Sequence, residues 1–142
     1  MIKIRAMNLA DIPQVYNLGI MEAGSKVSDL EKAFWSKDQL ENWVKSDDVL
    51  LIAEVDGATA GFILTALHKP TSKVTWENQV VAQEFRGLGV GLALINEMKT
   101  QLKARGATYV FFGIRLDNQH FGFYEKIGFE RGYDFTWYGM HL

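Results

Sequence analysis

The residues best suited to chemistry in this chain form a short glycine-rich loop in its second half. The loop consists of Arg86, Gly87, Leu88, Gly89, Val90 and Gly91. Glycine permits unusual backbone angles and lets a ligand approach the main chain closely, and the amides at a helix N-terminus attract anions. The sequence therefore predicts a phosphate-binding loop, and a plain glycine-rich turn is the alternative that these residues leave open.

Two familiar phosphate-binding motifs do not match this loop. A dinucleotide-binding G-x-G-x-x-G motif that starts at Gly87 requires glycine at position 92, where the chain has Leu92. A Walker A loop requires lysine followed by serine or threonine, and the glycine loop contains no such pair. Neither motif is present, so the loop has to be interpreted from the elements around it.

Three strands are expected before the loop. Residues 49–55 form a short apolar run, Asp56-Gly57 is a strong hairpin signal, and residues 60–67 return as a second strand. A third strand over residues 74–81 extends this antiparallel sheet. The loop therefore begins shortly after a predicted strand.

The longest predicted helix follows the loop, over residues 89–105. Ile95, Met98 and Leu102 lie on one helical face, and Gly106 stands where a C-terminal cap is expected. This helix places its N-terminal amides at the loop.

The last part of the chain is expected to complete the sheet. Residues 108–114 form a nearly unbroken β-branched and aromatic run, which indicates a strand covered on both faces. Asn118 can cap a last helix that ends at Gly128. Residues 129–142 are expected to form a final pair of strands.

The first part of the chain carries one strand and several helix signals. Residues 2–6 alternate apolar and charged side chains, which is typical of a half-buried strand. Asp11 is expected to cap the first helix, which carries Ile12, Val15, Tyr16 and Leu18. Two capping-box spacings predict one or two helices within residues 28–45; the pairs are Ser28 with Glu31 and Ser36 with Gln39.

No linker, repeat or low-complexity segment divides the 142 residues. We therefore expect a single α/β domain over residues 1–142, with a mixed, twisted sheet of about seven strands flanked by about four helices.

Composition limits the classes of function. The chain has no cysteine, which excludes disulfides, thiolate nucleophiles and Cys-ligated metal sites. A formal net charge of −2 gives no global attraction to nucleic acid, and no apolar run approaches the length of a membrane span. We expect a cytoplasmic protein that acts on small-molecule or protein substrates, with no nucleic-acid or membrane partner.

Two signatures resemble a known family. Arg86-x-x-Gly89-x-Gly91 after a strand is similar to the acetyl-CoA loop of the GCN5-related N-acetyltransferase (GNAT) family, although the usual Val-x-Pro lead-in has no proline here. The stretch from Asn118 to Phe129 looks like the family's second signature, with Phe121 where alanine is common. The resemblance covers essentially the whole chain and is weakest across residues 20–48.

The resemblance implies a GNAT-like fold and the transfer of an acetyl group from acetyl-CoA to a primary amine. It implies that amides from Arg86 to Gly91 hold the pyrophosphate and that Asn118 contacts the pantetheine. The backbone that holds the pantetheine arm and the acetyl carbonyl would be supplied by Gln79, Val80 and Val81.

The same resemblance implies two catalytic residues. Tyr124 occupies the family's general-acid position and would also meet the cofactor; a buried structural tyrosine is the alternative. Glu77 matches an acidic residue that faces the acceptor in many relatives; a solvent-facing strand glutamate is the alternative. No metal is expected, because His68, His120 and His141 form no metal-ligand spacing.

The acceptor is open at this point among peptide N-termini, lysine side chains, polyamines and other small amines. The aromatic side chains Phe34, Trp35 and Trp43 could line an acceptor pocket or pack as core. A non-catalytic acetyl-CoA-binding sensor or regulatory module is the alternative function, and the sequence leaves a homodimer open.

Overall fold

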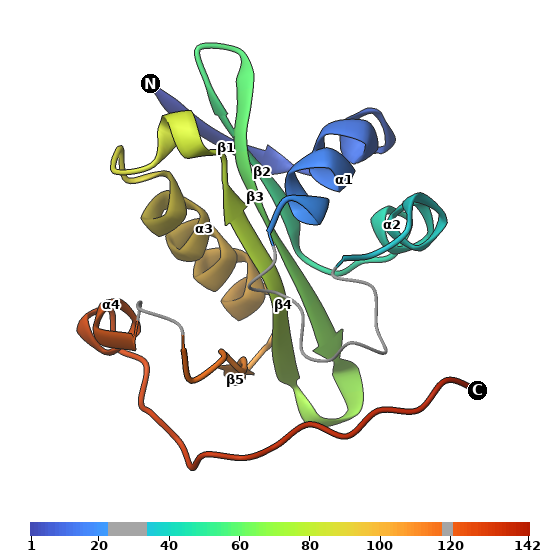
Figure 1. The fold of residues 1–142 in the computed structure, drawn as a ribbon, viewed down its shortest axis with the longest axis vertical. Helices are drawn as coiled ribbons and strands as arrows, with labels where there is room; N and C mark the ends of the chain where they lie inside the picture. Colours follow the sequence, from blue (N-terminus) through green and yellow to red (C-terminus); the bar gives the residue numbers. More distant parts are fainter. Residues whose placement is uncertain (23–33, 118–120) are drawn as a thin grey trace.

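The computed structural model describes residues 1–22, 34–117 and 121–142, and in these ranges five strands form one sheet (Figure 1). The strands, which follow one another across the sheet in chain order, are β1 (Ile2–Ala6), β2 (Leu50–Val55), β3 (Ala58–His68), β4 (Lys73–Val81) and β5 (Tyr109–Phe111). The first four pair antiparallel, and β5 runs parallel to β4. The sheet is therefore mixed, as expected.

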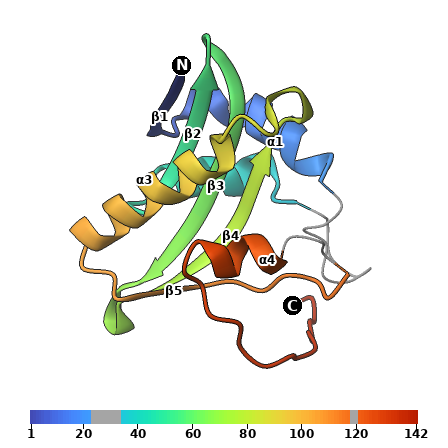
Figure 2. The same cartoon turned by 90° about the vertical axis from the view of Figure 1, so that its left-hand side faces the viewer.

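Within the described residues, four α-helices cover the two faces of this sheet. They are α1 (Ile12–Ile20), α2 (Lys37–Val44), α3 (Val90–Ala104) and α4 (Phe121–Lys126), and three short 3-10 turns are η1 (Leu9–Asp11), η3 (Lys69–Thr71) and η4 (Gln83–Phe85). Figure 1 shows α3 on one face and α1 with α2 on the other. Figure 2 shows α4 on the same side as α3, near β4 and β5.

Each face of the sheet has its own hydrophobic core. On the α3 face, Ile95, Met98 and Leu102 are all buried, which confirms the apolar helix face expected from their spacing. On the α1 and α2 face, Val15 and Leu40 are fully buried against β2 and β3. Because both faces are covered, the alternating side chains of the central strands are buried on both sides.

Two expected capping interactions differ in outcome. Ser36 and Gln39 form the predicted capping box of α2, with reciprocal hydrogen bonds of 3.2 and 2.8 Å. The other pair, Ser28 with Glu31, lies outside the described residues, as does Asn118.

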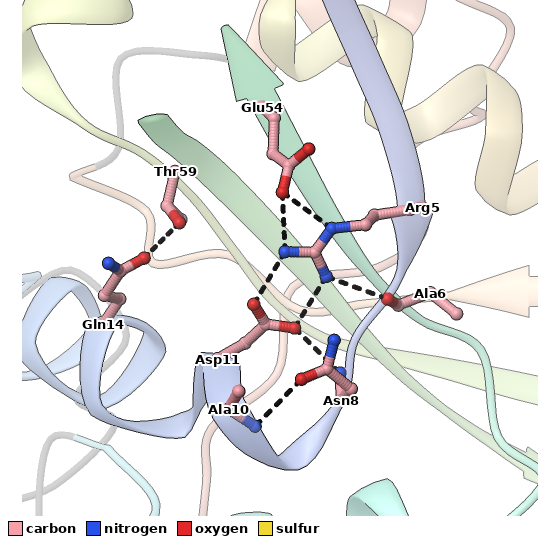
Figure 3. Close-up of polar contacts among 8 residues, drawn as sticks. All are labelled: Arg5, Ala6, Asn8, Ala10, Asp11, Gln14, Glu54 and Thr59. Carbon is pink, nitrogen blue, oxygen red and sulfur yellow. Dashed lines mark hydrogen bonds and ion pairs between the residues drawn. The ribbon is translucent and has the colours of Figure 1, made fainter. Parts of the chain in front are cut away.

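Asp11 stands at the N-cap position of α1, as expected, but its side chain makes no capping hydrogen bond there. Asn8 caps η1 instead, because its side chain accepts a hydrogen bond of 2.9 Å from the amide of Ala10 (Figure 3). The carboxylate of Asp11 accepts two hydrogen bonds from Arg5, of 2.7 and 2.8 Å, and one of 2.8 Å from the amide of Asn8. Arg5 also donates to Glu54 at 2.7 Å. These contacts fasten the start of α1 to β1 and β2.

In the part of the chain that the structure describes, the sheet has five strands, whereas about seven were expected. Residues 130–142 form neither strand nor helix, although Tyr133, Phe135 and Trp137 alternate as in a strand. The rings of Phe135 and Trp137 pack over Gly113, where an added Cβ would lie 3.4 Å from Trp137. The pairing between β4 and β5 also ends at Phe111, so a further strand could pair only with the short edge of β5.

The expected strand over residues 108–114 is reduced to the three residues of β5. Val110 and Phe112 are half-buried on the α3 side, but Tyr109 and Phe111 are exposed. The expectation that this strand is covered on both faces is therefore wrong.

Candidate active site

The glycine loop has the strained backbone that only glycine adopts easily. Gly87 and Gly89 have φ angles of 78° and 86°, in the left-handed region. The chain turns at these glycines between η4 and α3. Helix α3 begins at Val90, one residue after the expected start.

The N-terminus of α3 leaves amides available to a ligand. Gly89 is the N-cap and has no side chain that could accept a hydrogen bond. The amide of Ala93 already donates to the carbonyl of Gly89, at 3.0 Å. The first amides of the helix have no partner within it, and a helix N-terminus carries a partial positive charge.

Gln79 fixes the distance between β4 and α3. Its side-chain amide donates a hydrogen bond of 2.8 Å to the carbonyl of Gly91. A Cβ at Gly91 would lie 3.3 Å from the same nitrogen, so glycine allows the close contact. The resemblance gave Gln79 a backbone role only, and no local sequence pattern indicates this side-chain contact.

The side chain of Arg86 joins the loop to the end of β4. Its Nε donates to the carbonyl of Val81 at 3.0 Å, and a terminal nitrogen lies 3.8 Å from Glu22, just beyond α1. The guanidinium is more than half exposed.

A bulge in β4 separates the two halves of the site. Leu64 of β3 pairs with Asn78, but the next residue, Thr65, pairs with Trp76, which leaves Glu77 as an extra residue. The bulge reverses the facing of the side chains, since Trp76 packs in the α3 core and Val80 packs in the opposite core. The side chains after the bulge therefore point to the opposite face of the sheet from the one they would reach in an unbroken strand.

These elements line one broad cavity of about 2440 Å³, against the roughly 300–1,000 Å³ of a pocket for one small molecule. The structure brings nearly all of the expected site residues to it, namely Glu77, Gln79, Val80, Val81, Arg86, Gly87, Gly89, Val90, Gly91 and Tyr124. Leu88 is not among the lining residues, and its side chain is exposed.

A family model described as the acetyltransferase (GNAT) family matches residues 13–129 of this chain. The chain belongs to the GNAT family. An acetyltransferase from Pectobacterium atrosepticum is 32% identical over 84 residues, an alignment that spans 58% of each protein. The match thus covers a little over half of that relative's length.

Two solved structures share the GNAT fold over nearly the whole chain. AAC(6')-Iy in complex with the bisubstrate analogue CoA-S-monomethyl-acetylneamine has a TM-score of 0.80 at 19% identity, covering 100% of this chain and 99% of that one. The ribosomal-protein-S18-alanine N-acetyltransferase from Escherichia coli has a TM-score of 0.75 at 20% identity, with coverages of 94% and 80%. At these identities the likeness is one of fold.

Tyr124, the residue expected to act as general acid, is half-buried and lines the cavity. The ring packs 4.7 Å from Phe112 and 5.9 Å from Trp76, measured between ring centroids. Burial raises the pKa of the hydroxyl above its ordinary value of 10.0. The ring therefore packs in an aromatic cluster, while the side chain also borders the cavity.

Glu77 lies at the bulge and also lines the cavity. Its side chain is exposed by surface area, yet the cavity walls remove enough water from the carboxylate to raise its pKa above 4.5. It has no ion pair with another described residue. This setting differs from that of an ordinary solvent-facing strand glutamate.

Within residues 1–22, 34–117 and 121–142, no three metal-ligating side chains gather as they would at a metal site. His120 lies outside these ranges. None of the helices described in the structure has the length and apolar character needed to cross a membrane.

Proposed function

We propose that this chain is an acetyl-CoA-dependent N-acetyltransferase that transfers the acetyl group directly to a primary amine. The observation that carries the proposal is the shared cavity, where the loop at the start of α3, the bulged Glu77 and Tyr124 meet.

The donor half of the cavity has features that fit the pyrophosphate of acetyl-CoA. Gly87 and Gly89 hold the chain in a left-handed conformation without side chains over the amides. The partial positive charge of the α3 N-terminus and the exposed guanidinium of Arg86 favour an anion. The backbone of Gln79, Val80 and Val81 borders the same cavity and would hold the pantetheine arm.

The acceptor half needs a group that takes a proton from the amine. An ammonium ion is not a nucleophile, so one proton must leave before the nitrogen attacks the thioester carbon. Glu77 would accept this proton, directly or through a water molecule. Its raised pKa makes its carboxylate a stronger base than an ordinary glutamate.

The leaving group needs a proton in return. As the new C–N bond forms and the C–S bond breaks, the sulfur of CoA departs as a thiolate. The hydroxyl of Tyr124, kept protonated by its raised pKa, would donate its proton to that sulfur. One proton therefore leaves the ammonium ion toward Glu77 before the attack, and another reaches the sulfur from Tyr124. The attacking nitrogen loses a second proton as the amide forms, and this proton, passed directly or through water, restores the phenol of Tyr124.

The structural neighbours leave the acceptor open. One is named for a ribosomal-protein alanine, and another was solved with an acetylneamine group joined to CoA. The test is an acetyl-CoA turnover assay against a panel of amines, read by release of free thiol. Saturable acetyl-CoA binding without turnover on any amine would instead favour the non-catalytic sensor module.

A further inference from the structure

Trp35 stands directly before α2 and is fastened to the sheet beside the bulge. Its indole nitrogen donates a hydrogen bond of 2.6 Å to the side-chain oxygen of Asn78. Asn78 follows Glu77 in β4, so the tryptophan is tied to the residue next to the candidate base.

The orientation of the indole ring is also fixed from α2. The rings of Trp35 and Trp43 meet edge to face, with 5.2 Å between centroids and 81° between planes. Trp43 is held in turn, because its indole nitrogen donates to Asp48 at 3.0 Å. Since both sides of Trp35 are fixed, its ring is a preformed surface.

Trp35 lines the cavity, whereas Trp43 does not. Phe34 lines the cavity beside Trp35 and packs directly on α1, where Gly19 has no Cβ; an added Cβ would overlap the Phe34 ring. Phe34 also packs 5.6 Å from Phe62, between centroids. The acceptor side of the cavity therefore has an aromatic wall built on α1, α2 and β4.

Two carboxylates accompany this aromatic wall. Glu22 lies near Arg86, and Glu77 has no ion pair with another described residue. A carboxylate and an aromatic face together suit a cation attached to an apolar group, because the carboxylate attracts the charge and the ring covers the carbon chain.

We propose that Trp35 determines acceptor specificity and selects a primary amine carried on an apolar alkyl or aryl stem, an inference that rests on the proposed acetyltransferase function. The stem lies against the indole ring, and the amine reaches Glu77. Asn78 acts as a positioning residue, because its hydrogen bond holds the ring in place.

The test compares two amines that differ in their stems, phenethylamine and ethanolamine. Dissociation constants are measured by calorimetry with CoA bound, where no transfer occurs, and KM and kcat are measured with acetyl-CoA. Wild type is compared with Trp35→Ala, with Asn78→Ala as the second variant in case Trp35→Ala does not fold. Lys45→Ala is the control, since it removes only an exposed ion pair with Glu41 at the end of α2, and Lys45 does not line the cavity.

Trp35→Ala should raise Kd and KM for phenethylamine by about tenfold, as expected for losing an apolar contact. The kcat value and both constants for ethanolamine should stay within about twofold. Asn78→Ala should change the Kd and KM for phenethylamine in the same direction, and Lys45→Ala should change the constants for neither amine. Equal changes for both amines, or no preference of the wild type for phenethylamine, would overturn the inference.

The two proposals can fail separately. Selective binding of phenethylamine that Trp35→Ala weakens, without acetyl transfer, would support the binding role of Trp35 and contradict the acetyltransferase function. Acetyl transfer to amines whose selectivity Trp35→Ala does not change would support the acetyltransferase function and contradict the role of Trp35.

Discussion

The side-chain amide of Gln79 donates a 2.8 Å hydrogen bond to the carbonyl of Gly91, and this bond joins the end of β4 to the first turn of α3. Gln79 faces α3 because the bulge at Glu77 reverses the facing of the residues that follow it. The candidate base and the loop that would hold the phosphates are therefore linked through one strand and one side chain.

Gln79→Leu should weaken acetyl-CoA binding by about fivefold, because leucine keeps much of the volume and loses a hydrogen bond worth about 1 kcal/mol. Titration calorimetry measures the change. Gln101→Leu is the matched control, since Gln101 donates to Glu97 at 2.8 Å along the same helix but away from the loop. Equal losses in both variants would show that the contact only stabilises α3.

Gly89→Val should reduce acetyl-CoA affinity by tenfold or more, on the order of 1.4 kcal/mol. The side chain would stand beside the loop amides and force valine into a left-handed conformation. Gly57→Val is the matched control, because Gly57 has a φ of 82° against 86° at Gly89 and a Cβ would have open space at both.

Both glycine variants should lose about 1–2 kcal/mol of unfolding free energy from backbone strain. Only Gly89→Val should lose binding when the folded fractions are matched. If the two variants bind acetyl-CoA equally well, the loop is a plain turn.

Local patterns predicted the elements around the loop well. The spacing of Ile95, Met98 and Leu102 and the glycine at position 106 gave α3 to within about one residue at each end. Asp56 and Gly57 form the hairpin turn with φ angles of 50° and 82°. These signals depend only on neighbours in the chain, so they can be read without the fold.

The bulge could not be predicted in the same way. Trp76 and Val80 are both buried, and a regular strand would place both on one face. They pack on opposite faces because β3 pairs with Asn78 and Trp76 and leaves Glu77 out. The irregularity arises from the partner strand, which the order of residues in β4 does not encode.

The prediction of two strands over residues 129–142 is wrong for a related reason. The alternation of Tyr133, Phe135 and Trp137 is a strand pattern, but a strand also needs an edge with which to pair. β5 has only three residues, and the chain leaves the sheet after Phe111. Likewise, Asp11 has a capping residue type, but the nearby Arg5 binds its carboxylate instead.

Tyr124→Phe should slow acetyl transfer by about ten- to a thousandfold while acetyl-CoA affinity stays within about threefold. Phenylalanine keeps the ring contacts with Phe112 and Trp76 and removes only the hydroxyl. The measurement is single-turnover transfer at saturating acetyl-CoA. Wild-type speed in the folded variant would make Tyr124 a structural residue only.

Asp11→Asn should lower the unfolding free energy by about 2 kcal/mol at neutral pH, because it removes the charge that Arg5 binds. Burial alone would raise the pKa of Asp11, but hydrogen bonds from Arg5 and from the amide of Asn8 outweigh it and hold the pKa below 3.8. The charged form thus stabilises the fold above about pH 4, and this contribution is lost as the pH falls through the lowered pKa.

Urea unfolding at pH 7 and at pH 3 measures this change for wild type and Asp11→Asn. The difference between them should shrink at the lower pH. Asp56→Asn is the control, because its contact with the N-terminus is exposed to solvent. A difference that stays constant with pH would mean that the charge of Asp11 does not stabilise the start of α1.

Glu77→Gln should lower kcat/KM most near neutral pH and less at high pH, where more of the amine has already lost its proton. Desolvation by the cavity walls raises the pKa of Glu77 above 4.5, so the wild-type rate should fall as the pH drops through that raised value, which leaves the carboxylate protonated. The rate of Glu77→Gln should not show this fall at low pH. A pH–rate profile over about pH 5–10 tests both points. An equal rate loss at every pH would assign Glu77 to positioning of the amine, because a positioning contact does not depend on removing a proton.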